Sequence, residues 1–394
     1  MSTLKVDAIR HNSATSDAIT TAADGTCTAR ITGMTGGGGL SHRNIIINGD
    51  MRIAQRHTSS TTHPAYGVDR FRWGFGNHSA GTVTASQQSL TSSDTPYTLG
   101  FRKYTRLALG QAGTAAANTY INLTYKAEAQ DVANSGWNFT SASSYITISF
   151  WFRASTNQTF VGEFQSKDGT AQAYSFTFTA SGNNTWTKIT KTIPGGSNVQ
   201  IDNDNGGGFD FRWYAFYGTD YSTSGHTLDQ WGPYSSSDIV PDMASTWLTA
   251  GASTFDITGF QLEVGSQATA FEHRSFGEEL SLCQRYFYKI IGTSDDMAAI
   301  GFAQSSSDNY FNMEFPVPMR DYPTLTGSAT PARFLSANNG QDFNLNAMSL
   351  SSNMTNTNPK RVMLYVNQGG TSGGYGGALH FQNQEGFLEF SAEI

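Results

Sequence analysis

Polar and apolar residues alternate along five segments in the middle of the chain. They span residues 145–152, 173–179, 185–193, 209–216 and 254–264, and in each one side is aromatic or β-branched and the other is Thr, Ser or charged. A period of two predicts strands of a sheet with one buried face. Clusters of Gly, Asn, Asp and Ser separate the segments, with no helical pattern between them. The pattern predicts an all-β fold, a β-sandwich or jelly roll.

The regions on either side of these strands differ from them in residue pattern. Residues 1–43 carry short alternating stretches and end in a run of four glycines, which predicts an extended arm and a flexible break. Such an arm needs a partner surface, and the alternative is a frayed terminus. Residues 44–274 open with a buried strand at 45–47 and a turn at Asn48-Gly49. This part is expected to form the jelly-roll β-sandwich.

One helix is predicted after the sandwich. Ser275 and Glu278 have the spacing of a capping box, in which the serine side chain binds the first turn. Apolar residues then repeat at helical spacing as far as about Ile290. The sequence therefore predicts a short connecting α-helix over residues 275–290.

The last part of the chain, residues 291–394, returns to a strand pattern. Candidate strands at 309–315, 361–366 and 379–390 predict a small C-terminal β-sandwich. The Gly-rich segment 368–377 has the composition of a flexible surface loop.

Composition narrows the class of protein. The 394 residues suffice for two or three domains of roughly 150 residues each. Charged residues are 14% of the chain, too few for a coiled coil, and the 13% of aromatic residues argue against disorder. No run approaches the ~18 apolar residues of a membrane span. Membrane insertion is therefore not expected, and a net charge of −7 without a Lys/Arg-rich run disfavours nucleic acid or an anionic membrane as the main partner.

The N-terminus and the cysteines bear on the compartment. Residues 1–10 lack the apolar core of a secretory signal. Cys27 and Cys283 lie far apart in unlike contexts, which disfavours a disulfide framework. We expect the chain to be made and folded in a reducing cytoplasm.

Several stretches along the chain resemble sequences of known proteins. They are residues 2–9, 18–20 and 24–26, then 44–56 with 66–71, then 259–265 with 270–272, then 276–287, and last 315–320. The first group resembles the virion-proximal leader of bacteriophage tail-fibre or receptor-binding proteins, particularly those of marine phages or of the cyanophage type. The next two groups resemble the start and last strand of the carbohydrate-binding-module-like β-sandwich of those proteins. The remaining stretches resemble the helix that follows it and part of the last domain.

The resemblance implies a function and a setting. It implies a homotrimeric tail-fibre protein of the virion, which is made in the host cytoplasm and mediates adhesion to host-surface polysaccharide. Residues 1–43 would attach to a tail, baseplate or adaptor protein of the particle. The sequence leaves open whether host contact lies in the middle or the C-terminal domain. One alternative is a structural fibre or adaptor that binds other virion proteins, and a second is a polysaccharide depolymerase.

Candidate glycan-binding residues gather in one aromatic-rich stretch, residues 212–234. A sugar ring stacks its C–H face on flat aromatic rings, and its hydroxyls need short polar partners. Trp213 and Phe216 are expected in the core. The predicted binding platform consists of Tyr221, Trp231 and Tyr234, flanked by Asp220, His226 and Asp229. The alternative is that these rings close the end of the sandwich or pack at a subunit interface.

The sequence gives weaker evidence for a metal site or a catalytic site than for a glycan-binding site. The run Asp202–Gly208 is rich in oxygen ligands, so Asp202 and Asp204 are candidates for a structural calcium, and the alternative is an ordinary turn. No cofactor is otherwise expected. A depolymerase would need two carboxylates across a cleft. The candidates are Glu163, Asp168, Asp210, Asp220 and Asp229, but the sequence pairs none of them, so no enzymatic activity is predicted.

Overall fold

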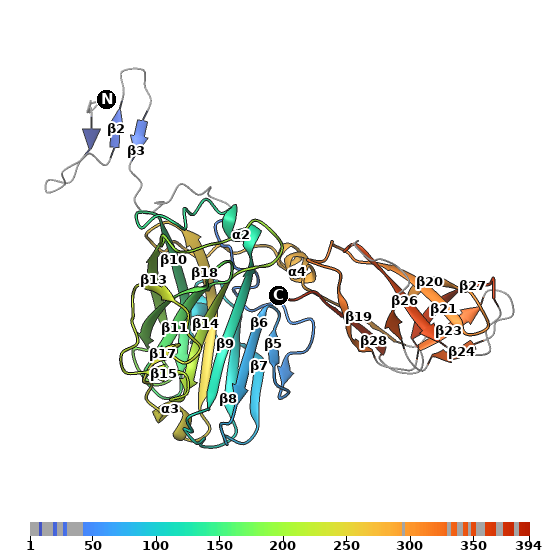
Figure 1. The fold of residues 1–394 in the computed structure, drawn as a ribbon, viewed down its shortest axis with the longest axis horizontal. Coiled ribbons are helices and arrows are strands. Elements are labelled where there is room, and N and C mark those ends of the chain that lie inside the picture. The colour runs from blue at the N-terminus through green and yellow to red at the C-terminus, as the bar shows by residue number, and fades with distance from the viewer. Residues whose placement is uncertain are drawn as a thin grey trace.

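The computed structural model describes residues 8–9, 19–21, 27–29, 42–293, 296–328, 332–336, 342–345, 348–351, 359–367, 373–381 and 386–394. Figure 1 shows an N-terminal group of strands, a large β-sandwich and a smaller C-terminal domain, with helix α4 between the last two. The protein is all-β, as the alternating pattern predicted. None of the helices within these residues is long and apolar enough to cross a membrane.

The sandwich consists of two antiparallel sheets. The six-stranded sheet has the order β13 (Thr187–Pro194), β10 (Tyr145–Ala154), β18 (Thr254–Val264), β8 (Lys103–Leu109), β7 (Val83–Ser89) and β4 (Ser59–Ser60). The seven-stranded sheet has the order β16 (Trp231–Pro233), β12 (Gln172–Thr179), β11 (Thr159–Ser166), β14 (Gly207–Tyr217), β9 (Tyr120–Glu128), β6 (Phe71–Gly76) and β5 (Ala65–Val68). The connections carry α1 (Thr95–Thr98), α2 (Ala129–Ala133), α3 (Thr246–Thr249) and a parallel pair, β15 (Ser222–Thr223) with β17 (Val240–Pro241).

Aromatic side chains fill the space between the two sheets. Phe150 on β10 lies edge-on to Trp213 on β14, with ring centroids 5.6 Å apart, and both side chains are fully buried. Phe152 makes a similar contact with Phe178 on β12, at 5.0 Å. Burying each such side chain stabilises the fold by roughly 1.5–3 kcal/mol. The expected core positions Trp213 and Phe216 are confirmed.

The segment 45–47 is buried, as predicted, but it is not a strand. Its main chain makes one bond to the six-stranded sheet, from Ile45 N–H to the Leu262 carbonyl at 3.0 Å. The chain then turns at Asn48, which has a φ of 60°. Gly49 packs against Phe260 so closely that a Cβ would lie 2.1 Å from the Phe260 carbonyl oxygen, so only glycine fits there.

The connecting helix is confirmed but shorter than predicted. α4 spans Phe276–Gln284, and Ser275 is its N-cap, with its Oγ accepting a bond from Glu278 N–H at 3.2 Å. The helix does not continue to Ile290, because Phe287–Gly292 form strand β19, which pairs with β28 (Gly386–Ser391). Phe287 continues the helical spacing of apolar residues, but it lies in a strand, where it is buried in the sheet.

The C-terminal domain is a second, smaller sandwich, as predicted. One sheet has the order β19, β28, β22 (Thr324–Ser328). The other has the order β24 (Asp342–Leu345), β23 (Ala332–Ser336), β27 (Gly376–Phe381), β20 (Met297–Ala303), β21 (Asp308–Glu314), β26 (Arg361–Asn367), β25 (Ser349–Leu350). The single strand predicted over 379–390 is wrong, since β27 and β28 belong to different sheets. Residues 368–372 of the predicted loop lie outside the described residues.

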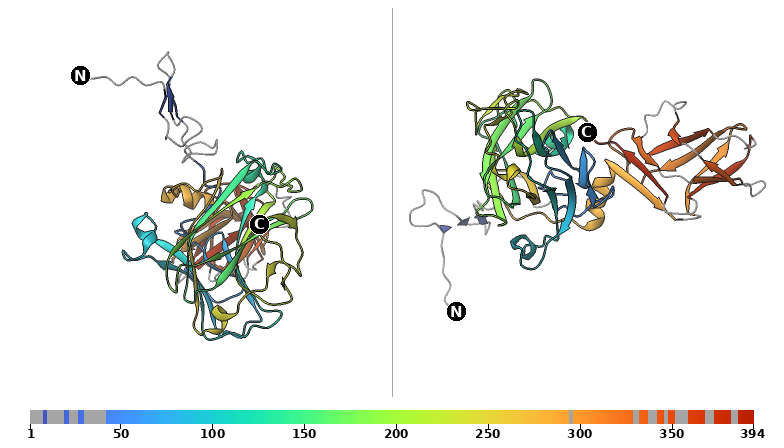
Figure 2. Two further views of the ribbon diagram at one scale, coloured as in Figure 1. Left: turned by 90° about the vertical axis from the view of Figure 1, so that its left-hand side faces the viewer. Right: turned by 90° about the horizontal axis from the view of Figure 1, so that it is seen from below.

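The chain returns to the large sandwich at its last residues (Figure 2). Glu393 forms ion pairs with Arg70 and Arg56, the latter at 3.0 Å. On the same side, Arg285 after α4 makes two bonds of 2.7 Å to the carboxylate of Glu128 at the end of β9. These partly buried contacts connect the two domains.

Part of the predicted arm is described. It consists of an antiparallel sheet of β1 (Ala8–Ile9), β2 (Ile19–Thr21) and β3 (Cys27–Ala29), which stands apart from the sandwich in Figures 1 and 2. The other residues of 1–41, with the predicted glycine break at 36–39, lie outside the described residues.

Candidate functional site

The seven-stranded sheet turns alternate side chains away from the core. On β9, Ile121, Leu123, Tyr125 and Ala127 belong to the core, and the residues that alternate with them face outward. Pairing between strands then aligns outward residues in rows across three strands. We call this surface the outer face, and it comprises Tyr120, Asn122, Thr124 and Lys126 of β9, Asp210, Arg212, Tyr214 and Tyr217 of β14, and Arg72, Gly74 and Gly76 of β6.

One end of the outer face is a group of tyrosines. The ring of Tyr217 lies 5.1 Å from Tyr221 and 6.3 Å from Tyr120, and all three are half-buried. A bulge in β14 after Tyr214 returns Tyr217 to the outer side. Gly76 leaves room for this arrangement, because a Cβ there would lie 2.6 Å from the Tyr120 ring.

Asn122 holds the tyrosine end in place. Its Oδ1 accepts a bond from the Tyr217 hydroxyl at 3.3 Å, and its Nδ2 donates to Thr124 Oγ1 at 2.7 Å. Burial raises the pKa of Tyr217, so this hydroxyl stays protonated and able to donate. His63, which is exposed, stands at the rim with its ring 6.1 Å from that of Tyr120.

A buried charge cluster underlies the middle of the face. Arg212 donates to Glu163 at 2.9 Å, to Gln165 at 2.6 Å and to Asp210 at 2.7 Å. Burial raises the pKa of Glu163, although Arg212 and the Tyr214 hydroxyl oppose that rise. Three acceptors therefore fix the Arg212 guanidinium in one orientation.

Residues 218–245 form a roof over the neighbouring part of the sheet. Ile239 and Val240 pack on Val161 and Tyr214, which are buried beneath them. Under this roof, Glu163 Oε2, Ser175 Oγ and His226 Nε2 are buried with no hydrogen-bond partner among the described residues. The roof stops short of β9 and β6, where Thr124 and Arg72 reach the surface.

A pocket of about 210 Å³ adjoins the tyrosine end. Its lining includes Tyr217 and residues with short polar side chains, among them Ser222, whose hydroxyl donates to Asp242 at 2.8 Å. Aromatic surface beside hydroxyl and carboxylate groups suits a sugar.

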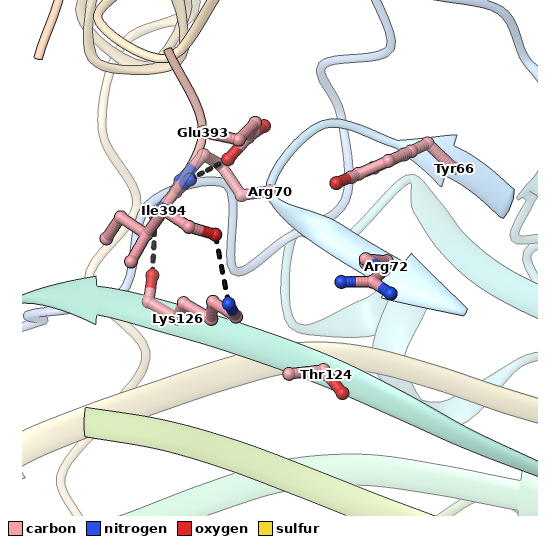
Figure 3. Close-up of a pocket in the computed structure, with 7 residues that line it drawn as sticks. All are labelled: Tyr66, Arg70, Arg72, Thr124, Lys126, Glu393 and Ile394. Atoms are coloured by element: carbon pink, nitrogen blue, oxygen red, sulfur yellow. Dashed lines mark hydrogen bonds and ion pairs between the residues drawn. The ribbon is translucent and has the colours of Figure 1, made fainter. Parts of the chain in front are cut away.

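The opposite end of the face is rich in cations. Figure 3 shows a small pocket lined by Tyr66, Arg70, Arg72, Thr124, Lys126, Glu393 and Ile394. Arg70 is paired with Glu393, and Lys126 Nζ donates to the Ile394 main-chain oxygen at 3.0 Å. Burial lowers the pKa of Lys126, and repulsion from Arg72, Lys167 and Arg212 adds to this.

Three of the six predicted platform residues lie at or under the roof. Tyr221 contacts Tyr217 and so joins the outer face. Tyr234 packs into the roof cluster, and its main-chain N–H donates to the Ala171 carbonyl at 2.9 Å. His226 is nearly buried and its Nδ1 lies 2.8 Å from Asp238.

The other three belong to the same segment but make different contacts, so the six residues do not form one platform. Trp231 packs toward the core against Phe164 and Tyr174, and its indole N–H donates to the Pro194 carbonyl at 2.7 Å. Asp229 pairs with Lys191 at 2.6 Å on the exposed edge. Asp220 is exposed in the turn after β14.

The calcium candidates lie in a turn. Asp204 Oδ1 accepts a bond from Gly206 N–H, and the carboxylate of Asp168 accepts from Asp202 N–H, each at 2.8 Å. Within the described part of the chain, no three His, Cys, Asp or Glu side chains are grouped to hold a metal ion. The calcium remains an untested expectation.

Sequence reasoning missed most of the outer face. Tyr120, Asn122, Thr124 and Lys126 occupy alternate positions of one strand, so their shared side was readable from the pattern. Their proximity to Tyr217 and Arg72 depends on strand pairing across the sheet.

No family model and no curated protein matches the sequence. Among solved structures, the tailspike protein 4 enzymatically active domain of bacteriophage CBA120 matches over 56% of this chain and 21% of that chain, at 11% identity and a TM-score of 0.29. The carbohydrate-binding module TmCBM61 in complex with β-1,4-galactotriose covers 56% and 97% of the two chains, at 10% identity and a TM-score of 0.27.

A family 11 carbohydrate-binding module of a Clostridium thermocellum cellulase covers 55% of this chain and 98% of that chain, at 12% identity and a TM-score of 0.25. Likenesses at this level carry no argument about what this protein binds. Its function has to follow from the chemistry of its own residues.

Proposed function

We propose that the outer face binds a glycan and that the protein works by adhesion. The observation that carries this proposal is the group of half-exposed rings, Tyr120, Tyr217 and Tyr221, on one side of a sheet. Such rings offer flat apolar surface to the C–H face of a sugar, and Thr124 and Arg212 offer hydrogen-bond donors to its hydroxyls.

Preorganisation favours binding at this face. The strands hold the rows at fixed spacing, and Asn122 and the Glu163–Arg212–Asp210 cluster hold side chains in one orientation. A site whose groups are already ordered loses less entropy on binding.

We further propose that this adhesion involves no turnover. Glu163 and Asp210 are the carboxylates nearest the middle of the face, and each is buried and bound to Arg212. A glycosidase needs two carboxylates that reach the substrate. Here both carboxylates instead accept hydrogen bonds from Arg212 and fix its orientation.

The setting we propose is a tail fibre of a phage particle, with the arm in 1–43 as the attachment segment and three chains per fibre. Three weak sites on one fibre would act together, so avidity would supply the strength. A native mass of about three times 42.6 kDa is expected, and a stable monomer would contradict the trimer.

An alternative role as a structural adaptor has one observation in its favour. The C-terminal domain exposes apolar side chains on β20, with Ile300 at 64% and Phe302 at 46% exposure. Exposed apolar residues side by side suit a protein partner.

The Tyr120→Ala variant tests the proposed function. We expect its monovalent affinity for host-surface polysaccharide to fall about tenfold, which is about 1.4 kcal/mol, because a stacking surface is lost. Binding is measured by calorimetry or by retention on host cells.

The matched control is Tyr145→Ala, which removes an exposed tyrosine from the six-stranded sheet and should bind normally. Equal affinity of the wild type and Tyr120→Ala would reject the face as the site. Release of new reducing ends from the polysaccharide would show hydrolysis and would contradict the proposal that the protein works by adhesion alone.

A further inference from the structure

The cationic end of the outer face contrasts with the protein as a whole. The chain has a net charge of −7. Arg72, Lys126 and Arg212 nevertheless project from three adjacent strands, and Lys167 follows the end of β11 beside them. Their mutual repulsion contributes to the lowered pKa of Lys126, after burial itself. Positive charges are therefore concentrated on this face, although the net charge of the chain is negative.

Acceptor groups on the protein offset only part of this charge. In the pocket itself, Glu393 pairs with Arg70 and Arg56, and Lys126 donates to the Ile394 main-chain oxygen. Asp210 pairs with Arg212 at 2.7 Å and with Lys167 at 3.4 Å, and Glu163 pairs with Arg212. Arg72 is exposed, and within the described residues its guanidinium forms no ion pair or hydrogen bond. An anion from outside the protein would find Arg72 free.

The pocket beside Arg72 has the size and donors for one anionic group. It offers about 20 Å³ of space, and a water molecule needs about 10–15 Å³, so an oxygen or two of an acid group would fit and a sugar ring would not. The Tyr66 hydroxyl points into it (Figure 3). Burial raises the pKa of Tyr66, and nearby Glu393 adds to this, so the hydroxyl remains a donor.

The pocket and the tyrosine end belong to one continuous surface. Tyr120 and Thr124 are four residues apart on β9, which is about 13 Å along a strand. Thr124 pairs directly with Arg72 on β6. An extended oligosaccharide on the tyrosines would therefore bring a later sugar over Arg72.

We propose that the ligand of the outer face is an anionic glycan, whose carboxylate or sulfate group binds Arg72 at the mouth of this pocket while its rings stack on the tyrosines. This inference rests on the proposed function and adds the chemical class of the glycan. A charge-assisted bond to an arginine is roughly twice as strong as a neutral one, so the acid group would contribute both affinity and selectivity.

The test uses the whole 394-residue chain and two matched pairs of polymers. One pair is a polyuronate and its methyl ester, and the other is a sulfated galactan and the same galactan after desulfation. We expect at least tenfold tighter binding to one acidic member than to its neutral form. We also expect that preference to shrink as NaCl rises from about 50 to 500 mM, since salt screens exposed charges. The pair that shows the preference identifies carboxylate or sulfate.

The variant Arg72→Gln removes the free cation. We expect the acidic polymer to bind about tenfold more weakly to it and the neutral polymer to bind as before. The control Arg102→Gln removes an exposed arginine next to the six-stranded sheet and should change neither. Equal loss in both variants would mean non-specific charge attraction and would overturn the proposal.

The remaining outcomes separate this inference from the proposed function. Equal binding of acidic and neutral polymers, together with weaker binding by Tyr120→Ala, would overturn the anionic class and leave glycan binding standing. If the wild type retains none of the four polymers or host polysaccharide, the proposed function fails and this inference fails with it.

Discussion

At the scale of single residues, neighbouring aromatic side chains in the sequence lie in different environments. Trp213 is in the core, Tyr214 is on the outer face but buried beneath the roof, and Tyr217 is on the outer face and half-buried, although five positions of one strand hold all three. Trp231, which the sequence grouped with Tyr221, lies against the core from the edge strand β16. Residue type therefore did not distinguish binding positions from packing positions.

The variant Trp231→Ala separates these two roles. Loss of the indole and of its bond to Pro194 should destabilise the protein by about 3 kcal/mol, near the lower end for large aromatic residues because Trp231 is only half-buried. Urea unfolding measures this. Glycan binding below the unfolding transition should be unchanged. Weakened binding at unchanged stability would instead place Trp231 in the binding site, as the sequence suggested.

At the scale of elements, local signals predicted the five alternating strands to within one or two residues at either end, and they predicted the start of the helix better than its end. The strand 254–264 has the predicted bounds, and the cap at Ser275 starts α4 as expected. The end of α4 was misplaced because Phe287 satisfies a helical repeat and a strand equally well. Its pairing with β28, about a hundred residues later, decided between them.

The cap of α4 can be tested directly. Ser275→Ala removes the acceptor for Glu278 N–H and should cost about 1 kcal/mol, measured as a lower midpoint in urea. Ser281→Ala in the same helix is the control, because the Ser281 hydroxyl only bonds back to the Gly277 carbonyl and its loss should cost less than about 0.5 kcal/mol. Equal losses in the two variants would contradict the capping role.

At the scale of the whole molecule, partly buried ion pairs join the two domains. Burial alone would raise the pKa of Glu128, but bonds from Arg285 and Tyr286 outweigh it and hold that pKa below its usual value. The pKa of Glu393 is lowered in the same way by Arg70 and Arg56, against the effect of burial. Both carboxylates are therefore more acidic in the folded protein than in the unfolded chain.

This predicts acid sensitivity at the junction. A lowered folded-state pKa contributes stability that is present above the unfolded value, about 4.3, and is lost as the pH falls through the folded value. Glu128→Gln should therefore cost about 3 kcal/mol at pH 7, because it leaves Arg285 without its carboxylate, and the gap to the wild type should narrow below about pH 4.

Denaturant unfolding of the wild type and Glu128→Gln between pH 3 and 7 measures that gap. Glu314→Gln, at an exposed glutamate on β21, serves as the control and should stay within about 0.5 kcal/mol of the wild type. A gap that is constant across the range would refute the ionic role of Glu128.

The sequence by itself determined the all-β class, the two sandwiches, most strands and the start of the connecting helix. These follow from the direction of successive side chains and from a cap within one turn, and both are local properties. Only the tertiary structure decided which polar sides lie together. Tyr120, Tyr217 and Arg72 meet because β14, β9 and β6 are neighbours in a given register, and the roof covers one part of that face and leaves another open. Register and coverage depend on contacts between residues far apart in the chain, which no local pattern encodes.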